Sequence, residues 1–190
     1  MKRIYATGAL LALLLSACAG QTETTPTVQP GAAAPGAIIA TNATLLDTGS
    51  PAMPQVGEAA PDFQFTMPDG TIQKLSDLQG KKVVLNFWAT WCEPCREEMP
   101  DLDKAYRKYG EDVVVLAVNK AEKVERIAAF SGQVPVSFPL IANPDADVAD
   151  RYFTVNVPLT FFINTDGTIG ARELKVMNYA TIERNIQMLK

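Results

Sequence analysis

The 190-residue sequence contains no histidine and only three cysteines. The absence of histidine excludes Ser-His-Asp and Cys-His catalysis, histidine-ligated haem and the usual zinc sites, so we expect neither a metal nor a cofactor. Acidic residues (21) outnumber basic ones (17), which gives a formal net charge of −4. This balance argues against a nucleic-acid partner, because neutralising phosphates requires a basic surface. Any thiol chemistry must come from Cys18, Cys92 or Cys95.

The N-terminal segment has the order of parts that is typical of a secretory signal peptide. Two basic residues precede an apolar run, residues 4–15, which is too short to span a bilayer as a helix. The next residues complete the segment LSAC, 15–18, which resembles the lipobox of bacterial lipoproteins. That resemblance implies cleavage before Cys18 and lipid on its sulfur. We therefore expect residues 1–17 to be a signal peptide and the mature protein to be anchored to a membrane in the cell envelope, outside the cytosol. A cleaved signal with a spare thiol is the simpler alternative.

Residues 18–56 are predicted to be the lipidated Cys18 followed by a flexible linker. This segment is rich in Ala, Thr, Pro and Gly and has no aromatic or basic residue. It therefore buries too little apolar surface to offset the entropy of ordering it. The short apolar spots at 38–39 and 45–46 receive no predicted structure. The folded domain is expected at residues 57–190, a length sufficient for one core.

The remaining sequence alternates between strand and helix patterns, which predicts an α/β fold. Continuous apolar runs at 83–88 and 113–118 are typical of buried central strands, with a helix at 94–109 between them. A strand that crosses over a helix to a parallel strand fits this order. The other expected elements are a β-hairpin within 60–75, helices at 122–131, 145–153 and 181–189 (the last capped by Thr181), a strand at 159–163 and a hairpin leading into 168–174.

The segment Trp91-Cys92-Glu93-Pro94-Cys95 lies between a predicted buried strand and a predicted helix. Two thiols without histidine cannot complete a zinc site, and Arg96 stands where a haem-attachment motif needs histidine. A structural disulfide is the simpler alternative, but so short a loop stabilises a fold only weakly. A helix N-terminus stabilises a thiolate, so we predict Cys92 to be the exposed nucleophile and Cys95 the buried resolving thiol.

Residues 84–95, which read VLNFWATWCEPC, resemble the active-site segment of thioredoxin-like proteins. More narrowly, they resemble the TlpA/ResA/DsbE group of membrane-anchored thiol-disulfide oxidoreductases. The segments APDF at 60–63 and LSDL at 75–78 fall where that group has similar residues. The resemblance covers about residues 56–190. It implies a thioredoxin-like fold, in which helices flank a central mixed sheet, with an N-terminal β-hairpin extension.

The resemblance also implies roles for residues outside the cysteine motif. Val157-Pro158 matches the cis-proline loop that faces the dithiol, where the Val157 backbone pairs with an extended substrate segment. Glu98 matches a glutamate that assists the proton chemistry of the dithiol. Classical thioredoxins carry a buried aspartate where this chain has Asn86, so Glu98 is the candidate general base for Cys95. The simpler alternatives are a solvated glutamate and an ordinary strand-edge proline. The expected substrate-binding residues are Trp91, Glu93, Pro94, Val157 and Pro158.

These features predict an extracytoplasmic reductase of protein disulfides, of the cytochrome c maturation or copper-site assembly type. The resemblance implies re-reduction by a membrane electron donor of the DsbD/CcdA type, and we expect a monomer. A disulfide oxidase, a non-enzymatic thiol copper chaperone and an adhesion lipoprotein with an inactive site remain open. A peroxidase of the peroxiredoxin type is disfavoured, because position 89 is alanine and no proline precedes Cys92 at the required spacing.

Overall fold

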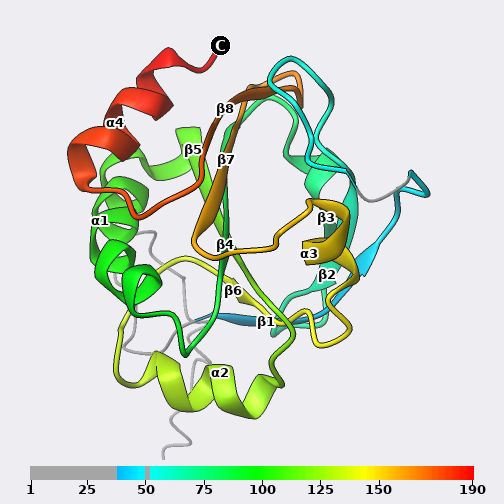
Figure 1. Ribbon diagram of the computed structural model, residues 1–190, viewed down its shortest axis with the longest axis vertical. Coiled ribbons are helices and arrows are strands. Elements are labelled where there is room, and N and C mark those ends of the chain that lie inside the picture. Colours follow the sequence, from blue (N-terminus) through cyan, green and yellow to red (C-terminus); the bar gives the residue numbers. More distant parts are fainter. Residues whose placement is uncertain (1–37, 50–51) are drawn as a thin grey trace, which may run out of the picture. The chain divides into compact units, whose positions relative to one another are not determined.

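The computed structural model describes residues 38–49 and 52–190 (Figure 1). The predicted signal peptide, Cys18 and the first part of the predicted linker lie outside the described residues. Within the described residues, eight strands form one mixed sheet in the order β3-β2-β1-β6-β5-β4-β7-β8. The strands are β1 (Ile39–Leu45), β2 (Phe63–Thr66), β3 (Ile72–Lys74), β4 (Lys82–Trp88), β5 (Val113–Asn119), β6 (Leu140–Ile141), β7 (Leu159–Ile163) and β8 (Ile169–Glu173). The α-helices are α1 (Glu93–Tyr109), α2 (Val124–Ser131), α3 (Asp147–Arg151) and α4 (Tyr179–Met188).

The central strand β4 is buried on both faces, as its apolar run predicts. It pairs in parallel with β5 and antiparallel with β7, so its backbone groups are used on both edges. Successive side chains of a strand point to opposite faces. Accordingly, Val84 and Trp88 join one apolar cluster and Leu85 and Phe87 join the other. Asn86 is the one polar side chain among the buried residues of this strand.

Helices cover both faces of the sheet. Apolar side chains of α1, α2 and α4 pack into the cluster that contains Trp88. Those of α3 pack into the opposite cluster together with side chains of β2. Figure 1 shows α1 beside α4, with α3 on the other side of the sheet. This arrangement confirms the predicted α/β fold with a mixed sheet and an N-terminal hairpin.

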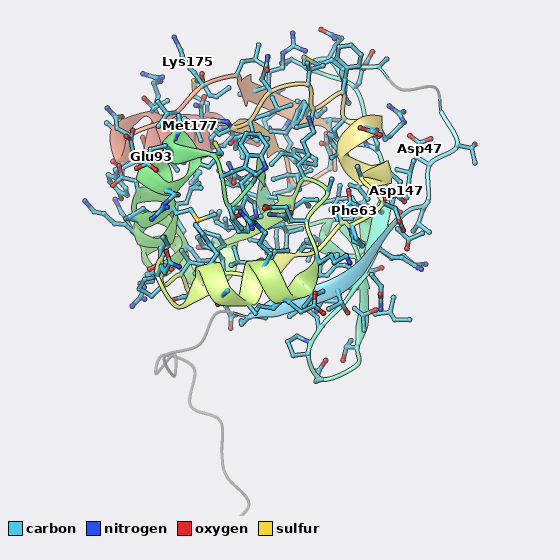
Figure 2. The ribbon with its side chains drawn as sticks, turned by 60° about the horizontal axis from the view of Figure 1, so that its bottom comes forward. Asp47, Phe63, Glu93, Asp147, Lys175 and Met177 are labelled. Atoms are coloured by element: carbon cyan, nitrogen blue, oxygen red, sulfur yellow. A yellow bond between two sulfur atoms is a disulfide. The ribbon has the colours of Figure 1, made fainter. Side chains whose placement is uncertain are left out.

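The prediction of a flexible linker as far as residue 56 is wrong for β1. This strand pairs in parallel with β6 and antiparallel with β2, and so connects the hairpin to the central sheet. Its inward side chains are Ala40 and Ala43, whose small apolar surface gives a weak sequence signal. Two contacts to the α3 region hold the end of β1 and the residues after it: Leu45 N–H donates to Asp147 at 2.9 Å, and Arg151 pairs with Asp47 at 2.6 Å. Figure 2 shows Asp47 and Asp147 on this side of the molecule.

Helix boundaries differ from the predicted ones where side chains cap the helix. Helix α4 begins at Tyr179 because the Asn178 side chain accepts a hydrogen bond from Thr181 N–H at 3.0 Å. The predicted cap at Thr181 is therefore wrong. Helix α1 begins at Glu93, one residue earlier than predicted, with Cys92 as its N-cap. Across residues 38–49 and 52–190, none of the helices has the length and apolar character needed to cross a membrane.

Candidate active site

The two cysteines form a disulfide at the start of α1, with the Cα atoms 5.3 Å apart. Cys92 caps the helix, and its sulfur accepts a hydrogen bond from Cys95 N–H at 3.2 Å. Cys95 is fully buried and Cys92 is 4% exposed. The prediction of a buried Cys95 therefore holds, whereas the prediction of an exposed Cys92 is wrong for this oxidised state, because both cysteines pack in the same apolar cluster. A sulfur that caps a helix receives the N–H donors and the positive dipole end that stabilise a thiolate after reduction.

The residues predicted to bind substrate surround this disulfide in two segments. Trp91 is 63% exposed, and Glu93 and Pro94 are exposed in the first turn of α1. Figure 2 shows Glu93 at this end of the helix. Trp88, three residues before Trp91, is by contrast fully buried against Phe130. The Trp91 ring is thus available to a bound partner, whereas the Trp88 ring belongs to the core.

The second segment contains the cis peptide bond between Val157 and Pro158. Pro158 is buried, and Val157 is half-buried against the apolar cluster that includes both cysteines. Strand β7 begins at the next residue, Leu159, which pairs with Phe87 of β4. The cis-proline therefore lies at the same end of β4 as the loop that leads to Cys92. The cis bond that the resemblance implied is present, so the simpler interpretation as an ordinary strand-edge proline is wrong.

Glu98 lies on α1 one turn after Cys95 and is 1% exposed. Its Oε1 accepts a hydrogen bond from Asn86 Nδ2 at 2.7 Å, and its Oε2 accepts one from Met177 N–H at 3.0 Å. Figure 2 shows Met177 in the segment between β8 and α4. Burial raises the pKa of Glu98 to about 7, although both hydrogen bonds favour the carboxylate. The alternative of a solvated surface carboxylate is therefore wrong.

Asn86 links Glu98 to strand β7. Its Nδ2 also donates to Thr160 Oγ1 at 2.9 Å, while its own Oδ1 has no hydrogen-bond partner within the described residues. The sequence indicated Asn86 and Glu98 but not Thr160 or Met177, which lie 74 and 79 residues away along the chain. We name these four residues the Glu98 site. Thr160 is the one polar residue in the apolar run of β7, and that polar position was the available sequence signal for it.

The chemistry of the site depends on whether Glu98 can exchange a proton with the dithiol. A carboxyl group with a pKa near the working pH can both accept and return a proton. No hydrogen bond of the described residues joins Glu98 to Cys95, whose sulfur is bonded to Cys92 in the disulfide and carries no proton. After reduction, Cys95 regains a thiol at the buried end of the motif, one helical turn from this carboxyl group.

A cysteine pair that caps a helix after a buried strand, with a cis-proline segment beside it, defines a thioredoxin-fold thiol-disulfide oxidoreductase. Residues 56–172 match the profile of the AhpC/TSA family, and the chain belongs to that family. It is 36% identical to thiol-disulfide oxidoreductase ResA of Geobacillus kaustophilus over 136 residues, which are 71% of this chain and 78% of ResA.

Two solved structures support the same class. A Chlorobium tepidum protein that carries the name thiol:disulfide interchange protein DsbE superposes with a TM-score of 0.66 and 31% identity, over 70% of this chain and 96% of that one. The exposed lipoprotein thioredoxin Etrx1 of Streptococcus pneumoniae has a TM-score of 0.60 and 27% identity, over 67% of this chain and 99% of Etrx1. The predicted family resemblance, the thioredoxin-like fold and the thiol-disulfide oxidoreductase activity are confirmed.

Proposed function

We propose that this chain is a lipid-anchored, extracytoplasmic reductase of protein disulfides. The observation that carries the proposal is the Cys92–Cys95 disulfide at the N-terminus of α1, with the buried Glu98 one turn beyond it. The N-terminal signal and lipobox pattern supports export and lipid attachment at Cys18. The relative Etrx1 is an exposed lipoprotein.

In the proposed reaction, the Cys92 thiolate attacks one sulfur of the substrate disulfide. The substrate S–S bond breaks, a mixed disulfide forms, and the second substrate sulfur leaves as a thiolate. The Cys95 thiol then passes its proton to Glu98 and attacks the Cys92 sulfur. This step re-forms the Cys92–Cys95 bond and releases the first substrate sulfur, so two electrons pass from the dithiol to the substrate.

The proposed substrate is an extended protein segment with a disulfide, as in an apocytochrome c before haem attachment or a copper-site assembly protein. The exposed ring of Trp91 supplies an apolar contact, with Glu93 and Pro94 beside it. The Val157 backbone ahead of the cis-proline pairs with the segment as an added strand. A membrane electron donor of the DsbD/CcdA type returns the electrons, and the chain acts as a monomer.

The redox potential of the pair tests the direction of the reaction. We expect equilibration with thiol buffers to give a strongly negative potential, near the value of about −270 mV of thioredoxin. A value near that of DsbA, about −120 mV, would instead identify a disulfide oxidase. The reduced protein should also reduce an oxidised apocytochrome c peptide, and Cys92→Ser should abolish this reaction. Cys95→Ser should hold the peptide as a mixed disulfide on Cys92.

The anchor is tested separately in cells. We expect the full chain to fractionate with membranes and to carry fatty acids on Cys18, as measured by mass spectrometry. Cys18→Ala should release the protein from the membrane without changing its activity toward the peptide. A membrane-bound Cys18→Ala protein would contradict lipid anchoring but would leave the redox chemistry unaffected.

A further inference from the structure

A short corner, Asn119–Glu122, joins β5 to α2 beside the active-site loop. Asn119 ends β5 opposite Trp88, the last residue of β4. Its side chain accepts a hydrogen bond from Glu122 N–H at 3.1 Å and donates one to the Glu122 carboxylate at 2.9 Å. Ala121 takes the left-handed conformation, with a φ of 62°. The corner is therefore a closed turn of fixed shape and not a free loop.

Glu122 holds the loop that carries the nucleophile. Its carboxylate accepts hydrogen bonds from Thr90 N–H at 2.7 Å and from the Thr90 hydroxyl at 2.6 Å. Thr90 lies two residues before Cys92. Burial raises the pKa of Glu122, but the hydrogen bonds from Thr90, Asn119 and Arg126 outweigh that effect, so the pKa lies below its usual value. Glu122 is consequently an anion at neutral pH and keeps all its donors.

Lys120 holds the segment that leads to the cis-proline. Its ammonium group donates to the carbonyl of Thr154 at 2.6 Å and to that of Val155 at 3.0 Å. Val155 lies two residues before Val157 and its cis peptide bond. Lys120 precedes α2, and its ammonium group binds these two backbone carbonyl oxygens.

We propose that the Asn119–Glu122 corner is a positioning device that fixes the spacing between the two segments to which a substrate binds. Glu122 holds the Cys92 segment through Thr90, and Lys120 holds the Val157 segment through two carbonyls. The inference rests on the proposed function, because it concerns substrate binding at the same dithiol. An extended peptide disulfide must contact both segments at once, whereas a small disulfide has to reach only Cys92.

The test compares these two kinds of substrate in single-turnover experiments with the reduced protein. The peptide substrate is the oxidised apocytochrome c peptide, and the small substrate is hydroxyethyl disulfide. We expect Lys120→Met to raise the half-saturating concentration of the peptide about five- to tenfold while the rate with hydroxyethyl disulfide stays within about twofold. Lys120→Arg keeps donors for both carbonyls, and we expect it to restore peptide binding.

Lys123→Met is the matched control, because it removes the same charge from an exposed residue of the same region. If Lys120→Met and Lys123→Met bind the peptide equally well, the inference is wrong. It is also wrong if Lys120→Met slows both substrates by the same factor, which would indicate a purely structural role. Lys120→Gln replaces the methionine variant in this comparison if that variant does not fold.

Glu122→Ala probes the other arm of the corner. Because it releases the segment that carries Cys92, we expect the rates with both substrates to fall, in contrast to the selective effect of Lys120→Met. Wild-type rates with both substrates would contradict the inference. A wild-type protein that fails to reduce the peptide at all would contradict the proposed function instead, so the two failures are distinguishable.

Discussion

Glu98 and Glu122 are both buried, and they differ in the hydrogen-bond donors that stabilise a negative charge on the carboxyl group. In the Glu98 site, the carboxyl group receives two hydrogen bonds, both from uncharged donors. In the Asn119–Glu122 corner, the carboxylate receives bonds from a backbone N–H, a hydroxyl, an amide and the guanidinium of Arg126. Burial raises the pKa of Glu98 to about 7, whereas the donors keep that of Glu122 below its usual value.

The comparison shows that burial alone does not decide the role of a carboxyl group. Desolvation disfavours the anion in both regions, and it does so more strongly for Glu98, which is 1% exposed against 9% for Glu122. Glu122 also receives more donors than Glu98, one of them charged, so the depth of burial and the donors together set the two pKa values. Where hydrogen bonds only partly offset the loss of hydration, the carboxyl group can exchange a proton near neutral pH, as Glu98 can. Where hydrogen bonds outweigh the loss of hydration, the carboxylate stays charged and serves as a fixed hydrogen-bond acceptor, as Glu122 does. The predictions below test this difference, beginning with the largest expected effect.

The first prediction concerns the stability of the oxidised protein between about pH 5 and pH 8. A raised pKa in the folded state means that the unfolded chain ionises first as the pH rises. Ionisation of Glu98 should therefore not change the free energy of unfolding below the unfolded pKa of 4.5. As the pH rises from there, the free energy of unfolding should fall, by roughly 3 kcal/mol in total at pH values above about 7. Glu98→Gln should remove this dependence, as measured by urea unfolding across the pH range.

Glu97→Gln is the control for that measurement, because Glu97 is exposed on the same helix. The free energy of unfolding of the Glu97→Gln variant should depend on pH as that of the wild type does. Glu122 should not contribute to the slope in this range, since a lowered pKa gives stability that is lost only as the pH falls below the usual carboxyl range. If the free energies of unfolding of wild type and Glu98→Gln differed by the same amount at every pH, Glu98 would not titrate near neutrality.

The second prediction concerns the attack of Cys95 on the mixed disulfide. Glu98→Gln should slow this step about a hundredfold at neutral pH, because glutamine cannot accept the Cys95 proton. The wild-type rate should rise as the pH passes about 7, where Glu98 ionises, and the variant should lack this rise. Rapid-quench trapping of the mixed disulfide measures the step. Equal pH profiles for wild type and variant would exclude Glu98 as the base.

The parts of the molecule that the sequence predicted are those with strong local patterns. The apolar run of β4 and the Trp91–Cys95 motif at the start of α1 are both continuous in sequence, and both were predicted correctly. Strand β1 was missed because its inward residues are alanines in a segment rich in turn-forming residues. Local composition there indicated disorder, and the pairing with β2 and β6 overrode it.

The partners in the two glutamate regions could not be predicted from local patterns. Thr90 and Glu122 lie 32 residues apart, and Lys120 reaches a carbonyl 34 residues away. Such contacts depend on the order of strands in the sheet, which periodicity does not specify. A signal was present in Asn119, the last residue of a buried strand, and in Glu122 three residues later, because side chains at strand ends often build sites.

The third prediction converts the Glu98 site into a pair of carboxyl groups. Asn86→Asp would place a second carboxyl group where an amide now donates to Glu98 at 2.7 Å. Two adjacent carboxylates cannot both ionise readily, so the pair should keep a proton to a higher pH. We expect the midpoint of the pH profile for Cys95 attack to rise by about one unit or more. An unchanged midpoint would show that Asn86 does not influence the proton affinity of Glu98.

The last prediction separates the effect of the charged, exposed donor of Glu122, Arg126, from that of its neutral donors, Thr90 and Asn119. Arg126 contacts the Glu122 carboxylate at 2.9 Å, but its side chain is 66% exposed, so water screens the ion pair. Arg126→Met should therefore lower the free energy of unfolding by less than about 1 kcal/mol, as measured by urea unfolding against Lys123→Met. Thr90 and Asn119 should still hold the carboxylate, so the peptide should bind as it does to wild type. A large loss of peptide binding would mean that the guanidinium, and not the neutral donors of Thr90 and Asn119, keeps Glu122 in place.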